Sequence, residues 1–154
     1  MTKKPEIVKW EDLIEREDGL YYKKYARVPF TGAVKDFYEN GQLSSRLNYK
    51  NGEQDGLTEW FHENGQLHFK FNYKNGQQEG LTEAFNANGQ LRRRDNYKND
   101  EQDGLSEWFH ENGQVGERGY YKNGEREGLT EIFNANGQLS SRLNYKDDKL
   151  VKSN

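Results

Sequence analysis

Three histidines, His62, His68 and His110, are the side chains best suited to bind a metal or to move a proton near neutral pH. His62 and His110 are each followed by glutamate, but neither pair has the second histidine that the HExxH zinc motif needs. These two histidines lie 48 residues apart, which the strand arrangement derived below converts into roughly 19 Å. The pattern predicts no metal site and no cofactor, and favours histidines that flank exposed turns.

Other catalytic chemistry has little support in the residues. The chain has no cysteine, which excludes disulfides, thiolate zinc sites and cysteine nucleophiles. No serine, histidine and aspartate constellation stands out, and no glycine-rich phosphate loop precedes a helix. The 26 acidic residues are spread evenly along the chain, as is typical of a solvated surface. We therefore predict that the protein is not an enzyme and has no catalytic residues.

The charge pattern disfavours two classes of partner. The net charge is −3 and the isoelectric point is about 5.7, so the chain has no overall attraction to nucleic acid or to an anionic membrane. The sharpest basic cluster is Arg92-Arg93-Arg94, whose middle side chain would point away from the other two in a strand. We expect a solvated strand there, and no nucleic-acid partner.

The first residues, Met1-Thr2-Lys3-Lys4-Pro5-Glu6, have no apolar segment behind the charges and do not resemble a secretory signal. No run of the sequence approaches the roughly 18 apolar residues of a membrane span. We expect a cytoplasmic protein.

A tandem repeat of 24 residues organises most of the chain. The segment Gly56-Leu57-Thr58-Glu59-Trp60-Phe61-His62-Glu63-Asn64-Gly65-Gln66-Leu67 recurs three times after it and once, in degenerate form, before it. Five anchor glycines keep the spacing without an insertion: Gly32, Gly56, Gly80, Gly104 and Gly128. Such a fixed period indicates a repeat architecture, in which each unit packs against its neighbours.

Each repeat carries two turn signals between runs rich in Thr, Tyr, Phe and Trp, which predicts a β-hairpin. The second signal is Asn-Gly in three repeats, and Asn99-Asp100 and Asp147-Asp148 in the other two. At the first signal a three-residue loop, Glu63-Asn64-Gly65 in the second repeat, keeps the apolar residues in phase, with glycine in the left-handed position. The turn glycines expected there are Gly41, Gly65, Gly89, Gly113 and Gly137.

This phase predicts that the odd-numbered apolar residues share one packed face. They are Leu57, Phe61, Leu67, Tyr73, Leu81, Phe85, Leu91, Tyr97, Leu105, Phe109, Val115, Tyr121, Leu129, Phe133, Leu139 and Tyr145. Glu59, Glu83, Glu107 and Glu131 fall in the same phase, where burying a carboxylate costs stability unless it is solvated or paired.

The even-numbered face carries the candidate binding residues. The pattern Trp-Phe-His-Glu at 60–63 recurs at 108–111, which places large apolar side chains at every second repeat. The row consists of Trp60, Ala84, Trp108 and Ile132, flanked by His62 and His110. Exposed tryptophans in a line are typical of a protein-binding surface. The alternative is that each tryptophan packs on its neighbours and that the alternation reflects a two-repeat duplication.

Residues 1–31 do not repeat, and we expect them to cap the array formed by residues 32–151. Trp10, Leu13 and Ile14 have the spacing of a short helical turn, and Leu20-Tyr21-Tyr22 reads as a strand. The polar end from Lys149 to Asn154 is expected to fray. The predicted fold is all-β: an elongated single-layer antiparallel sheet of about ten strands.

The aromatic strand, Asn-Gly-Gln-Leu, Asn-Tyr-Lys-Asn-Gly and the following Asp-Gly or Glu-Gly resemble the MORN-variant repeat of bacterial proteins, including YwqK-like antitoxins. The lead-in Pro29-Phe30-Thr31-Gly32 resembles the segment before such arrays. The resemblance covers nearly the whole chain and implies an elongated β-sheet, with no catalytic residue carried over.

The repeat array, the tryptophan row and the lack of catalytic chemistry favour a protein-binding module. The resemblance implies an antitoxin or immunity-type role with a partner protein such as a toxin. A peripheral membrane or scaffold role is the alternative, which rests on the resemblance and which the acidic balance disfavours. A homodimer is a third hypothesis, because the last predicted strand, near Leu143 to Tyr145, would leave an unpaired edge.

Overall fold

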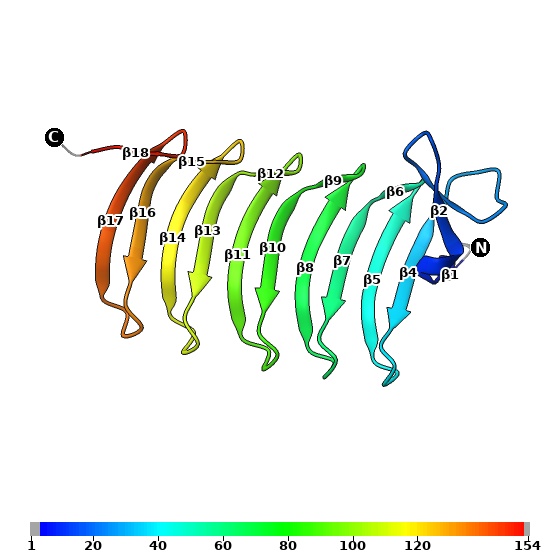
Figure 1. The fold of residues 1–154 in the computed structure, drawn as a ribbon, viewed down its shortest axis with the longest axis horizontal. Coiled ribbons are helices and arrows are strands. Elements are labelled where there is room, and N and C mark those ends of the chain that lie inside the picture. The colour runs from blue at the N-terminus through cyan, green and yellow to red at the C-terminus, as the bar shows by residue number, and fades with distance from the viewer. Residues whose placement is uncertain (1–3, 153–154) are drawn as a thin grey trace. The chain divides into compact units, whose positions relative to one another are not determined.

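A computed structural model describes residues 4–152; residues 1–3 and 153–154 lie outside the described part, together with the sequence predictions made for them. The chain divides into two compact units, Met1–Gln77 and Gln78–Asn154, which are described separately. Each unit contains one layer of neighbouring strands (Figure 1). This confirms the all-β class and the single-layer arrangement of antiparallel hairpins.

Unit 1 contains a short N-terminal segment followed by two complete hairpins. Its main sheet has the strand order β1-β4-β5-β7-β8, in which β1 is parallel to β4 and the later pairs are antiparallel. Its elements are β1 Ile7–Val8, the 3-10 turn η1 Trp10–Asp12, β2 Leu13–Glu15, β3 Tyr21–Lys23, β4 Gly32–Phe37, β5 Leu43–Lys50, β6 Glu53–Gln54, β7 Gly56–Phe61 and β8 Leu67–Lys74. The two-residue β9, Gln77–Gln78, lies at the division between the units.

Unit 2 contains three hairpins in the strand order β10-β11-β13-β14-β16-β17-β18. Its elements are β10 Gly80–Phe85, β11 Leu91–Lys98, β12 Glu101–Gln102, β13 Gly104–Phe109, β14 Val115–Lys122, β15 Glu125–Arg126, β16 Gly128–Phe133, β17 Leu139–Lys146 and β18 Lys149–Leu150. The fraying predicted from Lys149 is wrong for its first residues, because Lys149 and Leu150 pair with Lys146 and Tyr145.

The loop predicted at each first turn is present. His62 N–H donates to the Gln66 carbonyl at 2.8 Å, which leaves Glu63, Asn64 and Gly65 as the three loop residues. The five loop glycines, Gly41, Gly65, Gly89, Gly113 and Gly137, have φ between 83° and 86°. The Asn64 carboxamide oxygen also accepts the Gln66 N–H, which fixes the loop from inside.

The predicted packed face is wrong, because a β-bulge follows each loop. Trp60 lies opposite Phe69 and Phe61 lies opposite Leu67, so His68 is the extra residue of β8. Leu57, Phe61 and Leu67 therefore lie on one face, whereas Tyr73 lies on the other. The same register shift in every hairpin also separates Tyr97, Tyr121 and Tyr145 from the leucines and phenylalanines of their repeats.

In each unit the glutamate ladder lies on one face of the sheet, here called the Glu face, and arginines pair with three of its four members. The ladder consists of Glu59, Glu83, Glu107 and Glu131. Arg46 donates to Glu59 at 2.9 Å, and Arg142 donates to Glu131 at 3.2 Å. Glu107 lies between two arginines, with Arg118 at 3.1 Å and Arg94 at 3.9 Å. These three carboxylates are paired with arginines from neighbouring strands; Glu107 is buried, and Glu59 and Glu131 keep partial exposure to solvent.

The second turn ties each repeat to the one before it. Asn75 N–H donates to the Asp55 carboxylate, and Gly76 N–H donates to the Gln54 carbonyl. The same acceptors recur at Thr31, Glu79, Asp103 and Glu127. The residue before each anchor glycine, which is acidic in every case except Thr31, thus caps a turn of the following repeat.

Two of these turns have aspartate where the others have glycine. Asp100 and Asp148 hold φ of 68° and 62°, a region that L residues visit at a cost. Their carboxylates accept the N–H groups of Gln78 and Arg126, each at 2.7 Å. This added hydrogen bond offsets the backbone strain and accounts for the Asn99-Asp100 and Asp147-Asp148 variants.

The N-terminal segment covers part of the first hairpin and forms a hydrophobic core with it. Phe30 of this segment and Val34, Leu47 and Tyr49 of the sheet are buried together with Leu13. The predicted helical turn is limited to Trp10–Asp12, where the Asp12 carboxylate accepts the Lys9 N–H. Leu13 and Ile14 continue as a strand that pairs with β3.

Two glycines test the contact between the N-terminal segment and the array. Gly41 and Gly52 have nearly equal φ, 83° and 84°, but only Gly52 has close neighbours: a Cβ there would lie 2.8 Å from Leu20 Cβ and 2.9 Å from Pro29 Cβ. Gly41→Ala should lower the free energy of unfolding by about 1 kcal/mol through strain, and Gly52→Ala by about 1–3 kcal/mol more through overpacking. Urea denaturation measures both, and equal losses would contradict the contact.

Two glutamates of the ladder, Glu107 and Glu131, can be compared for their contribution to stability. The Glu107 side chain is 10% exposed and has two arginine partners, whereas the Glu131 side chain is 21% exposed and has one. Glu107→Gln should cost about 1–2 kcal/mol of unfolding free energy, and Glu131→Gln less than about 1 kcal/mol. Thermal or urea unfolding of both variants checks the order, which would be wrong if Glu131→Gln were the more destabilising.

Candidate functional site

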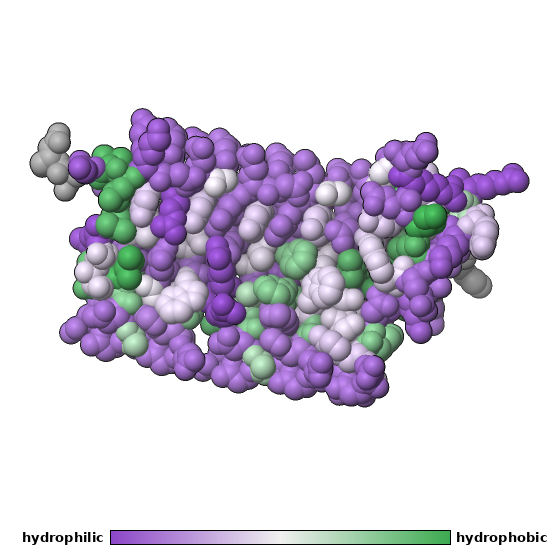
Figure 2. Space-filling model, in the orientation of Figure 1, coloured by the Kyte–Doolittle hydropathy of each residue, from purple (hydrophilic) through white to green (hydrophobic). Residues whose placement is uncertain are grey.

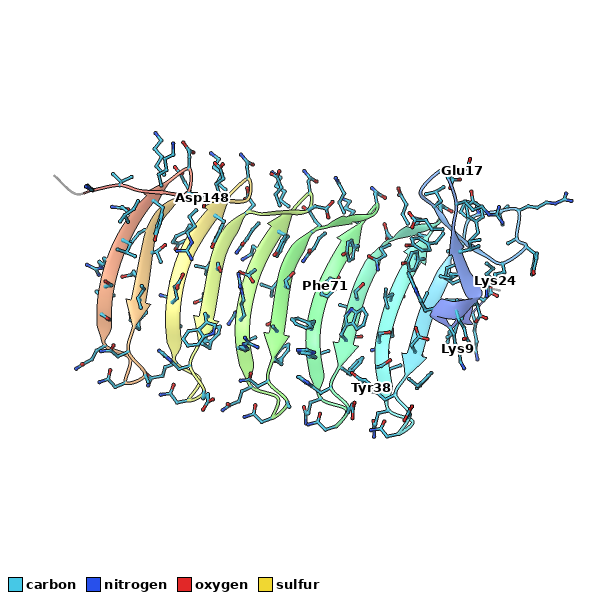
Figure 3. The ribbon with its side chains drawn as sticks, viewed as in Figure 1. Lys9, Glu17, Lys24, Tyr38, Phe71 and Asp148 are labelled. Carbon is cyan, nitrogen blue, oxygen red and sulfur yellow. The ribbon has the colours of Figure 1, made fainter. Side chains whose placement is uncertain are left out.

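The face opposite the Glu face carries the tryptophans and is here called the Trp face. In unit 1 the residues that lie opposite one another across it, from β4 to β8, are Asp36, Ser45, Trp60 and Phe69. Trp60 is 45% exposed and Phe69 is 38% exposed, although both are large apolar side chains. Green and pale side chains gather over β7 and β8, between hydrophilic turns (Figure 2), and Phe71 is labelled on β8 in Figure 3.

Trp60 forms one wall of a cavity of about 420 Å³ in unit 1. Trp10 of the N-terminal segment contributes to the same cavity, and so do two acidic residues; the full lining is Trp10, Glu11, Asp36, Ser44, Ser45, Leu47 and Trp60. Ser45 and Leu47 are buried, whereas Trp10 is 45% exposed. The backbone N–H of Trp10 donates to Asp36 Oδ1 at 3.4 Å, which holds the N-terminal segment beside β4.

Trp60 also contributes to a second hollow, of about 430 Å³, with mostly aromatic walls. It is lined by Tyr38, Trp60, Phe61, His68, Phe69 and Phe71. The rings of His62 and His68 are stacked with centroids 4.0 Å apart, and the ring of Phe69 lies 4.0 Å from that of His68. His62 is therefore half-buried within an aromatic cluster rather than on an exposed turn.

In unit 2 the Trp face carries the remaining row residues, but charged side chains separate them. Following the register from β10 to β17, the facing residues are Ala84, Arg93, Trp108, Glu117, Ile132 and Ser141. The predicted members of the row are brought into line here, with Arg93 and Glu117 between them. Trp108 is 42% exposed, while Ala84 and Ile132 are half-buried.

Trp108 packs on its neighbours, which was the alternative considered for the tryptophan row. Its ring lies directly on Gly116, where a Cβ would be 2.1 Å from Trp108 Cζ3, and it meets the His110 ring edge-on. His110 Nε2–H donates to the Phe133 carbonyl at 2.8 Å, which joins its repeat to the next. His110 thus has a structural role, as does Tyr38, whose hydroxyl donates to the Phe61 carbonyl.

The sequence prediction missed a buried carboxylate on the Trp face of unit 2. Asp95 is 5% exposed and accepts hydrogen bonds from Arg93, Gln102 and Ser106. Asp95 occupies the position that Leu47 has in the first repeat, so only its departure from the repeat pattern could have drawn attention to it. All three donors belong to unit 2, so this hydrogen-bond network stabilises the fold of that unit.

Burial raises the pKa of two tyrosines of unit 1, Tyr21 and Tyr49. Burial raises the pKa of the Tyr49 phenol, and burial together with Glu15 raises the pKa of Tyr21. Both phenols are therefore neutral near neutral pH. The charges beside the Trp10–Trp60 cavity come from Glu11 and Asp36.

Within residues 4–152, no group of three or more His, Cys, Asp or Glu side chains could hold a metal ion. No helix in that part of the chain is long and apolar enough to cross a membrane.

A repeated β-hairpin of this design defines a class of tandem-repeat β proteins, and the family comparison agrees. The model of the MORN repeat variant family matches five segments, at residues 30–51, 54–75, 78–99, 102–124 and 126–147. These segments cover more than half of the chain, so the protein belongs to the MORN repeat variant family. No curated protein matches the chain.

The contact between Trp108 and Gly116 can be tested directly. Gly116→Ala places a methyl group where the indole lies, so the ring must move. The indole N–H signal of Trp108 should shift more than those of Trp10 and Trp60 in a proton–nitrogen NMR spectrum. Gly113→Ala, at a glycine with no neighbour within 4 Å, serves as the control. An unmoved Trp108 signal in Gly116→Ala would contradict the packing.

Proposed function

We propose that this protein is a protein-binding module that holds its partner on the Trp face of unit 1. The observation that carries the proposal is the group of partly exposed aromatic side chains Trp10, Trp60 and Phe69 around two hollows. Large aromatic side chains of this kind supply much of the binding energy at protein interfaces. A soluble protein that leaves them uncovered on one face is expected to use that face for binding.

The negative charge of this face restricts the kind of side chain that a partner can place on it. Glu11 and Asp36 line the first cavity, so the partner segment should combine apolar side chains with a positive charge. The corresponding face of unit 2 has Arg93 and Glu117 beside Trp108, which makes it the more polar of the two. Trp60 is therefore the proposed anchor, and Trp108 is its counterpart at the same repeat position.

The antitoxin or immunity-type role is the specific form of this proposal that the repeat resemblance supports. In that form the partner is a toxin, and the occupied Trp face blocks the toxin's own contacts. Such inhibition requires no catalytic group in this chain.

Trp60 and Trp108 provide a matched pair of variants. The tagged wild-type protein, Trp60→Ala and Trp108→Ala should be used to capture partners from the source cell lysate, and the captured protein should then be purified and titrated. Trp60→Ala should weaken binding by about 30-fold, which corresponds to roughly 2 kcal/mol, while Trp108→Ala should change it by less than about threefold. Circular dichroism confirms that each variant is folded.

Equal binding by all three proteins would show that the Trp face of unit 1 is not the contact surface. The antitoxin form has its own test, since co-expression should restore growth against a toxic partner with the wild-type chain but not with Trp60→Ala. A partner that has no toxic activity would reject the antitoxin form and retain the binding module.

A further inference from the structure

We infer that the cavity between Trp10 and Trp60 receives an arginine side chain of the partner, an inference that rests on the proposed function and deepens it. The two tryptophans come from different parts of unit 1, η1 and β7, and line one cavity of about 420 Å³. Ser45 and Leu47 are its most buried lining residues, at 4% and 7% exposed. A cavity of this size is within the range that accepts a long side chain.

Two carboxylates in this cavity have no cationic partner. Among the described residues of unit 1, ion pairs form between Lys23 and Glu6 and between Arg46 and Glu59, and none includes Glu11 or Asp36. The Asp36 carboxylate accepts a 3.4 Å hydrogen bond from the backbone N–H of Trp10, which is a neutral donor. The Glu face thus neutralises its glutamate internally, whereas the Trp face of unit 1 presents negative charge outward.

An apolar side chain alone would fit this cavity poorly. Covering Glu11 and Asp36 with hydrocarbon would remove water from both carboxylates without replacing its hydrogen bonds, which is costly. An acidic side chain would be repelled. A cationic side chain avoids both problems, because it pairs with the two carboxylates and is attracted to the faces of the two indole rings.

Arginine fits better than lysine for reasons of shape. The guanidinium group is flat, so it can stack on an indole ring while its N–H groups point sideways to a carboxylate. It is also less strongly hydrated than an ammonium group, and its three methylene groups can pack over Leu47. The Trp10–Trp60 cavity offers indole rings for stacking and carboxylates for hydrogen bonding in the same place.

The experiment uses the three tryptophans of the chain as reporters. Their indole N–H signals, assigned with single Trp→Phe variants, are followed while N-acetyl-arginine amide is added to the full-length protein. The Trp10 and Trp60 signals should shift together and saturate with a dissociation constant on the order of 1–10 mM, while Trp108 stays in place. N-acetyl-citrulline amide, which has the same shape without the charge, should bind at least about tenfold more weakly.

The carboxylates are tested with isosteric variants. Asp36→Asn keeps an oxygen acceptor for the backbone N–H of Trp10, so the N-terminal segment should stay in place. Combined with Glu11→Gln, it should weaken arginine-amide binding by about tenfold or more. Glu39→Gln, at an exposed turn residue outside the cavity, is the matched control and should have no effect.

The inference is overturned if arginine amide moves neither the Trp10 nor the Trp60 signal, or if the citrulline amide moves them equally. Loss of partner capture in Trp60→Ala together with either of those results would keep the proposed function and reject the arginine site. A saturable, charge-dependent shift of the two unit 1 signals supports the site without any partner being known.

Discussion

A single layer of strands has no second layer on which to pack, and this constraint governs the rest of the structure. Only a few large apolar side chains are buried, and most of those in the main core lie under the N-terminal segment. Stability must therefore come from contacts between successive hairpins. These contacts are made on both faces and at both ends of the strands, as expected of a repeat protein whose units interact with their nearest neighbours.

The two ends of the hairpins use different groups for the same purpose. At one end Asn75 N–H meets the Asp55 carboxylate of the preceding repeat. At the other end the Tyr38 hydroxyl and the His110 ring donate to carbonyl groups of the following repeat. Because backbone groups at the turns would otherwise rely on solvent, these hydrogen bonds order segments that are normally the most mobile part of a hairpin.

The turn chemistry could be predicted from the sequence, but the faces of the sheet could not. Asn-Gly signals determine loop length locally, whereas the bulge at His68 depends on how two strands pair. The bulge position holds serine, histidine, arginine and glycine in different repeats, so no residue type marks it. The one available warning was the glutamate ladder, which made no physical sense on a packed face and is explained by arginines such as Arg46 on the Glu face.

The candidate site could also be predicted only in part, because it depends on contacts between residues far apart in the sequence. The position of Trp60 on an exposed face followed from its place in the repeat. Trp10 lies outside the repeat, and its spacing to Leu13 and Ile14 predicted only a short helical turn. Tertiary contacts with β4 place it beside Trp60 instead. Local pattern cannot reveal a cavity whose walls are 50 residues apart in the sequence.

The residue before each anchor glycine accepts a hydrogen bond from the following repeat, and this has a genetic consequence. Asp55, Asp103 and Glu127 all present the same acceptor to the next repeat, and Thr31 presents an equivalent one at the start. A segment of 24 residues duplicated or deleted in register would therefore meet compatible hydrogen-bonding groups at the new junction. Changes in repeat number should be tolerated by this fold far more readily than insertions of any other length.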